Sequence, residues 1–257
     1  MNASRSTHMK IGHALARFLT EASVGQSSSP PTPRHRLLAM LRPGDVLLVE
    51  GRSRISAAIK YLTQSTWSHA ALYVGALGSE RLAAPNHCFV EADLVEGVRS
   101  IGVDEYDGLH TRICRPVDLT ESETAIVVDY MIGRIGHRYD LRNVFDLARY
   151  LLPYPPKPAR FRRRMIALGS GDPTRAICST LIAQAFEAIS YPVLPHIDYL
   201  PAPTPDSRVC IEEVLRVRHH TLFAPRDFDV SPYFRLIKPT IDGGFNFRAL
   251  QWHGAAE

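Results

Sequence analysis

The chain has little cysteine, and the cysteines that it has are not paired by spacing. Its 257 residues include four of them: Cys88, Cys114, Cys178 and Cys210. No two form the CxxC spacing of a zinc or redox site, and four in this length do not indicate a disulfide scaffold, so we expect reduced thiols. The 11 histidines show no HExxH or similar ligand spacing, and His219 and His220 are adjacent. We therefore expect no metal and no cofactor, and a metal-dependent hydrolase is the weakest of three candidate functions.

Long apolar segments are absent as well. No apolar run approaches the 18 residues of a transmembrane helix, and the N-terminus lacks the pattern of a signal peptide. We therefore expect a cytoplasmic protein. Hydrophobic residues make up 45% of the chain, which provides for a substantial core and argues against disorder over most of its length.

Positive charge is concentrated in one segment. The formal net charge is +4, and a single stretch contributes more than this total, through Lys157, Arg160, Arg162, Arg163 and Arg164. Arginines next to aromatic residues suit anionic lipid headgroups, so the second candidate function is a non-enzymatic binder of anionic membrane surfaces. Binding of nucleic acid is disfavoured, because no recognition motif accompanies the Arg160–Arg164 patch.

Hydrophobic periodicity and turn residues predict a mixed α and β protein. Strands are expected at 46–49, 69–75, 88–92, 97–101, 111–116, 208–211 and 234–237. Helices are expected at 36–41, 53–63, 121–134 and 143–152, and from residue 178 onward. The third of these helices follows a capping box at Thr120 and Glu123.

Two motifs about a hundred residues apart carry the chemistry. Residues 67–75, WSHAALYVG, predict a strand with His69 near its start, and residues 176–182, AICSTLI, predict a helix that opens at Cys178. A histidine base and a helix-borne cysteine are the two parts of a thiol nucleophile. In most papain-like sequences the cysteine comes first, whereas here the histidine does, so the order indicates circular permutation.

A cysteine becomes a useful nucleophile when a helix N-terminus and an imidazolium lower the pKa of its thiol. Cys178 receives both if His69 faces it, and its unpaired backbone N–H can then help to hold an oxyanion. A third polar group orients the imidazole through its other nitrogen, and Glu91 on the following strand is the candidate. Simpler explanations stand beside these: a cysteine that begins a helix is most often a small buried hydrophobic residue, and Glu91 can be a solvent-facing strand residue.

Together the motifs resemble a known family. The stretches PGDVLL at 43–48, SHAALYVG at 68–75, VEA at 90–92 with GV at 97–98, and CSTL at 178–181 are similar to the permuted NlpC/p60 papain-like proteins. Within that superfamily the chain resembles the YiiX/YebB-like cysteine hydrolases, over roughly residues 41–237.

The resemblance implies an α+β fold of the circularly permuted, papain-like (NlpC-type) kind, in which a small antiparallel, barrel-like sheet packs against the cysteine helix. It implies that Cys178 is the nucleophile, His69 the base and Glu91 the polar third member. Asp45 and Tyr139 match recurrent family positions near the cleft, although a turn residue and a packed aromatic side chain are alternatives. We expect substrate-binding roles for these two residues and for Ser68 and Ser179.

The resemblance implies a hydrolase domain over residues 37–239. Outside it, periodicity and composition predict an N-terminal amphipathic helix and a Ser/Pro-rich linker at 1–36, and we expect residues 240–257 to form a C-terminal tail. A Pro/Arg-rich insertion at 153–175 interrupts the domain, and it either borders the cleft or is a solvated loop.

The leading candidate function is therefore a cysteine hydrolase that cleaves an amide, peptide or (thio)ester bond through an acyl-enzyme on Cys178, with His69 as base. Its substrate is then a small peptide-like molecule or an acyl lipid. A lipid-directed acyl hydrolase or acyltransferase is an alternative, because the same chemistry gives acyl transfer when another acceptor replaces water. The sequence leaves the scissile bond and the oligomeric state open.

Overall fold

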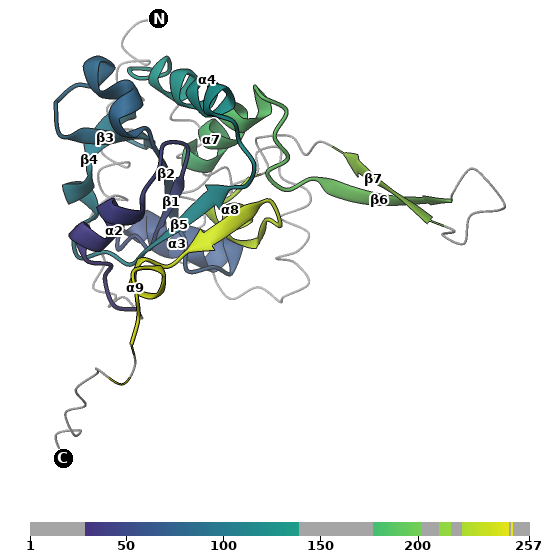
Figure 1. Cartoon of the computed structure of the whole chain (residues 1–257), viewed down its shortest axis with the longest axis horizontal. Helices are drawn as coiled ribbons and strands as arrows, with labels where there is room; N and C mark the ends of the chain where they lie inside the picture. Colours follow the sequence, from purple (N-terminus) through teal and green to yellow (C-terminus); the bar gives the residue numbers. More distant parts are fainter. Residues whose placement is uncertain (1–28, 139–176, 202–210, 217–222, 247, 249–257) are drawn as a thin grey trace, which may run out of the picture.

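The computed structural model of the protein is built around one open antiparallel sheet (Figure 1). It describes residues 29–138, 177–201, 211–216, 223–246 and 248. The six strands lie in the order β4 (Gly97–Gly102), β3 (His87–Asp93), β2 (His69–Tyr73), β1 (Val46–Val49), β5 (Thr111–Pro116) and β8 (Phe234–Ile237). Because β4 and β8 are opposite edges that do not pair with each other, the expectation of a barrel-like sheet is wrong.

Helices and short 3₁₀ turns connect the strands. They are α2 (Arg34–Met40), α3 (Arg54–Thr63), η1 (Gly75–Arg81), η2 (Val103–Tyr106), α4 (Glu121–Ile132), α7 (Ile177–Glu187), α8 (Pro225–Val230) and α9 (Pro239–Asp242). A separate antiparallel pair, β6 (His196–Pro201) and β7 (Ile211–Arg216), projects from the body of the molecule in Figure 1.

The expected elements correspond closely to these. The capping box is present: the Thr120 hydroxyl accepts a hydrogen bond from the Glu123 backbone N–H, and the Glu123 carboxylate accepts one from the Thr120 backbone N–H. The strand expected at 208–211 begins only at Ile211 within the described residues. The N-terminal helix, the 143–152 helix and the 153–175 insertion lie outside the described residues, so the predicted division into domains stays a prediction.

Each face of the sheet packs against its own cluster of buried side chains. On one face, Leu48, Ala70 and Leu72 contact side chains of α4, α7 and α8. On the other face, Leu47 and Phe89 pack with residues of α2 and η2. The four residues of β1 are therefore all buried, which is the arrangement expected from its uninterrupted apolar run.

Candidate active site

Cys178 lies in the first turn of α7, and the packing of that helix places it against β2. The apolar stripe of α7 is buried, with Leu181, Ile182 and Phe186 between 0% and 3% exposed. This stripe packs on β2 and β3 and against α4. Cys178 itself is 5% exposed, and the backbone N–H of Ala70 on β2 is directed at its sulfur.

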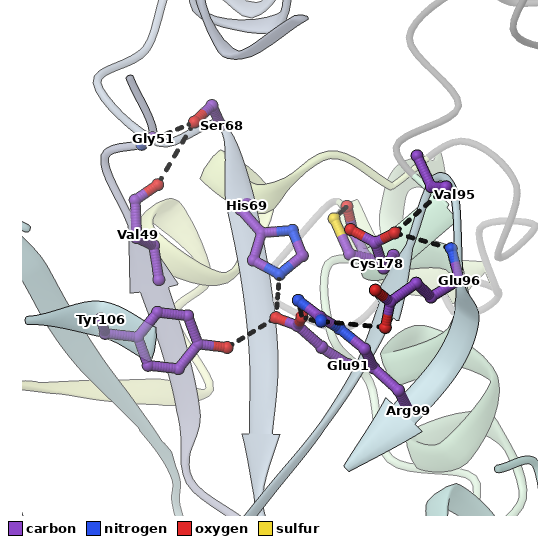
Figure 2. A network of polar contacts seen from close by, with 12 residues as sticks. Val49, Gly51, Ser68, His69, Glu91, Val95, Glu96, Arg99, Tyr106 and Cys178 are labelled. Carbon is purple, nitrogen blue, oxygen red and sulfur yellow. Dashed lines mark hydrogen bonds and ion pairs between the residues drawn. The ribbon is translucent and has the colours of Figure 1, made fainter. Parts of the chain in front are cut away.

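His69 and Glu91 come from neighbouring strands. The register of β2 and β3 places Ala71 opposite Glu91, so Glu91 is the diagonal neighbour of His69 on the same side of the sheet. His69 Nε2 donates a hydrogen bond to Glu91 Oε2 at 2.6 Å. The second ring nitrogen of His69 is thereby left for Cys178, and Figure 2 shows that edge of the ring turned toward the sulfur.

The electrostatics favour a thiolate and an imidazolium. Burial opposes charge on Cys178, but the charge of His69 and hydrogen bonds from His69, from Ala70 and from Ser179 outweigh it, so the pKa of the Cys178 thiol is lowered. Burial likewise opposes charge on His69, but Cys178 and Glu91 raise the pKa of the imidazole well above its usual value. Both shifts move the proton from sulfur to nitrogen.

Glu91 is a buried carboxylate that accepts hydrogen bonds from three side chains (Figure 2). Its Oε2 accepts from His69 and, at 2.7 Å, from the Tyr106 hydroxyl, while its Oε1 accepts from Arg99 Nε at 2.9 Å. Arg99 Nη2 also lies 2.8 Å from Oε1. Burial would raise the pKa of Glu91, but His69, Arg99 and Tyr106 together lower it to about 2.

Arg99 and Tyr106 were not among the predicted site residues. Arg99 stands directly opposite Glu91 in the β3–β4 pair, so a basic residue on the strand expected to pair with 88–92 was an available signal. Tyr106 lies in η2, beyond β4, and no local pattern connects it to Glu91. Both residues are separated in sequence from the cysteine and histidine motifs that guided the prediction.

The two serines lie beside the Cys178–His69 pair. Ser68 is 2% exposed, and its hydroxyl accepts a hydrogen bond from the Gly51 backbone N–H at 2.9 Å, which fixes the chain at the start of β2. Ser179 is fully buried, with its hydroxyl 4.0 Å from the Cys178 sulfur. Their predicted roles in substrate binding stay predictions.

The structure does not bring Asp45 to this site. β1 pairs Val49 with His69 and Val46 with Leu72, so Asp45 is at the far end of the strand, about 13 Å from the His69 end. Its carboxylate is 1% exposed and accepts hydrogen bonds from Arg115 Nε and Nη2, each at 2.8 Å. Asp45 therefore forms an ion pair with Arg115 at the far end of β1, and its role in substrate binding stays a prediction. Tyr139 lies outside the described residues.

Within the described part of the chain, no group of three or more His, Cys, Asp and Glu side chains is arranged to hold a metal ion. No helix in the same part is both long and apolar enough to cross a membrane.

Comparisons with known proteins bear on the chemistry of this arrangement. Residues 40–150, which include His69 and Glu91 and end before Cys178, match a family model described as permuted papain-like amidase enzyme, YaeF/YiiX, C92 family. A similar solved structure is the crystal structure of the metalloprotein YiiX from Escherichia coli O157:H7, at 15% identity and a TM-score of 0.43, covering 77% of this chain and 96% of that chain. A comparison with curated proteins finds no match. The family match confirms the resemblance stated from the sequence: the chain is an enzyme, a cysteine hydrolase, and it is similar to the permuted papain-like amidases of the YaeF/YiiX family.

Proposed function

We propose that the protein cleaves an amide, peptide or (thio)ester bond through an acyl-enzyme on Cys178. The observation that carries this proposal is the continuous contact chain from the Cys178 sulfur through His69 to Glu91, in which the pKa of the thiol is lowered and that of the imidazole is raised. A thiolate beside an imidazolium is the reactive state of a cysteine nucleophile.

The geometry suggests the following sequence of steps. The Cys178 thiolate attacks the carbonyl carbon, and the negative charge passes to the carbonyl oxygen, near backbone N–H groups of the first turn of α7 that have no partner within the helix. The His69 imidazolium then gives its proton to the leaving group as the scissile bond breaks. In the second half, neutral His69 takes a proton from water, the hydroxide attacks the thioester, and the carboxylic acid product leaves with Cys178 returned to the thiolate. Glu91 orients His69 throughout.

We also propose that the papain-like arrangement is circularly permuted in this chain. What supports the proposal is the element order: β2, with the proposed base, precedes α7, with the proposed nucleophile. The third residue, Glu91, follows the base in the next strand.

Alkylation of the cysteines tests the thiolate–imidazolium pair without knowledge of the substrate. Reaction with iodoacetamide is followed from pH 4 to 9 by mass spectrometry, in the wild type and in His69→Ala. Cys178 is expected to react well below the ordinary thiol pKa of 9.0, and His69→Ala to remove that advantage. Cys114 is the internal control, because it is equally buried but burial raises the pKa of its thiol. A Cys178 that reacts no faster than Cys114 would contradict the proposal.

Turnover tests the same residues as catalysts. Acyl esters, thioesters and peptides are screened with the wild type, Cys178→Ser, His69→Ala and His87→Ala. His87 is the matched control, a strand histidine that forms a hydrogen bond with the Ser100 hydroxyl and is not a member of the Cys178–His69–Glu91 contact chain. Loss of turnover in the first two variants, with folding intact, is expected, and full activity in either one would end the hypothesis.

A further inference from the structure

A polar pocket of about 310 Å³ lies beside the segment that leads into β2 and takes no part in the contact chain described above. It is bordered by the connection between α3 and β2, by the start of β5 and by α8. The lining side chains that matter are Trp67, His110, Arg112, Arg226 and Asp229. Trp67 precedes His69 by two residues, so the pocket adjoins the segment that carries the proposed base.

In one wall of the pocket, the side chains are held by mutual contacts and their charges cancel. Arg112 Nη1 lies 2.7 Å from Asp229 Oδ1, and the Arg112 guanidinium lies over the Trp67 ring at 4.9 Å from its centre. The His110 ring also stacks on the Trp67 ring, with the ring centres 5.2 Å apart. These contacts hold the wall in place and cancel the charge of Arg112.

Arg226 supplies the charge that is not cancelled. Its Nη1 donates a hydrogen bond to the Thr63 backbone carbonyl at 2.9 Å, and it forms no ion pair with any of the described residues. A guanidinium has five N–H donors in a planar fork, so this anchor fixes the group and leaves donors for a ligand. Among the described residues that line the pocket, one positive charge is therefore unbalanced.

The strand register connects the pocket to Cys178. Ala70 on β2 stands opposite Leu48 on β1, and Leu48 stands opposite Arg112 on β5. Residues directly opposite one another point to the same face, so Arg112 lies on the face that packs against α7. Neighbouring strands are about 4.8 Å apart, which places Arg112 about 10 Å from Ala70, the residue whose N–H is directed at the sulfur.

We propose that this pocket is a subsite that receives a carboxylate carried by the substrate, with Arg226 as its principal donor. The assignment rests on the proposed function, since a carboxylate held in this pocket would belong to a substrate whose scissile bond lies at Cys178. A single unbalanced charge, with the Asp229 carboxylate also in the lining, favours a monoanion over a phosphate dianion. A planar guanidinium fork matches the two oxygens of a carboxylate.

The test uses affinity alkylation with paired reagents. Cys178 is alkylated with 6-(bromoacetamido)hexanoate and with its neutral carboxamide, which share a reactive carbon and differ in charge at the far end. The carboxylate reagent is expected to react about tenfold faster or more at low salt, because hydrogen bonds to a charged group contribute about that much. Arg226→Gln removes the difference without changing the rate of the carboxamide.

Control variants distinguish the loss of the Arg226 charge from a loss of folding. Arg235→Gln removes an exposed arginine of β8 that does not line the pocket, and the preference is expected to persist. Arg226→Lys keeps the charge without the fork and retains part of the preference, which distinguishes loss of charge from misfolding. A phosphonate-tailed reagent is expected to gain less than the carboxylate, and a larger gain would overturn the carboxylate assignment.

The two proposals fail in different ways. If Cys178 reacts with both reagents no faster than Cys114 reacts, the proposed function is wrong. If Cys178 reacts fast with both reagents and shows no preference for the carboxylate, or a preference that survives Arg226→Gln, the subsite is wrong and the proposed function stands.

Discussion

At the scale of single residues, the charge of Glu91 determines whether the His69 imidazole is protonated. The side chain is 4% exposed, and its charge is supported by His69, Arg99 and Tyr106. A buried carboxylate without such donors would be protonated, and a protonated Glu91 would not favour the charged imidazole.

Glu91→Gln is therefore expected to lower kcat/KM by about 100-fold or more, because removal of the charge that orients and stabilises an imidazolium has effects of that order or larger. The change also shifts the alkylation profile of Cys178 to higher pH. Glu96→Gln, at the exposed end of the same arginine contact, is the control and leaves both properties unchanged. An unchanged profile in Glu91→Gln would show that Glu91 only fills space.

Tyr106→Phe removes one hydrogen bond to Glu91 and keeps the ring that packs against Phe89. We expect a loss of about 1–3 kcal/mol in the free energy of unfolding, measured by urea denaturation, because a buried acceptor loses a donor. Tyr73→Phe is the matched control, since Tyr73 also packs on Phe89 and its hydroxyl has no hydrogen bond among the described residues. Equal losses in both variants would contradict this assignment.

The lowered pKa of Glu91 also predicts how stability depends on pH. The carboxyl pKa is about 2 in the folded protein and 4.5 ordinarily, so the stabilisation is present above about 4.5 and is lost as the pH falls toward 2. The difference in unfolding free energy between the wild type and Glu91→Gln is expected to shrink over that interval. A difference that stays constant from pH 6 to pH 2 would show that the charge of Glu91 is not its source.

At the scale of elements, the N-terminal cap of α4 is expected to contribute to stability without affecting the active site. Thr120→Ala removes the cap of α4 and is expected to lower the free energy of unfolding by about 1 kcal/mol, with kcat/KM unchanged. Ile126→Ala, a change at an exposed position of the same helix that takes no part in the cap, is the control, and both are measured by urea denaturation. A loss of activity in Thr120→Ala would show that α4 and α7 are more tightly coupled than their packing implies.

The elements that could be predicted were those with local signals. The cap of α4, the apolar run of β1 and the buried stripe of α7 are each visible in a few consecutive residues. The strands of His69 and Glu91 were also predicted, and their adjacency followed from consecutive order along the chain. The ion pair of Asp45 with Arg115 and the hydrogen bond of Tyr106 to Glu91 could not be predicted, because strand order and the packing of η2 determine them. The same is true of the open sheet, which depends on where β8 pairs.

At the scale of the whole molecule, the site depends on both hydrophobic clusters. Cys178 packs in the cluster with Leu48 and Ala70, whereas Tyr106, which holds Glu91, belongs to the cluster on the opposite face. Loosening of either cluster therefore disturbs one end of the contact chain.

The Arg160–Arg164 patch gives a prediction that rests on sequence alone, because it lies outside the described residues. We expect the full chain to co-sediment with vesicles that contain anionic lipid, and the binding to weaken with salt. A variant with Arg160, Arg162, Arg163 and Arg164 changed to Gln is expected to lose this binding, and Arg235→Gln to keep it. Absence of binding to anionic vesicles at low salt would identify the patch as a solvated surface.

The position of Arg99 opposite Glu91 has a consequence for charge neutrality. A thiolate, an imidazolium, a carboxylate and a guanidinium together carry no net charge. In the proposed mechanism this total stays at zero when the charge moves to the carbonyl oxygen, and again when the neutral acyl-enzyme forms beside a neutral imidazole. Without Arg99 each of these states would carry one excess negative charge in a buried setting. Arg99 on the edge strand β4 thus keeps the net charge of the site at zero in every step of the proposed reaction.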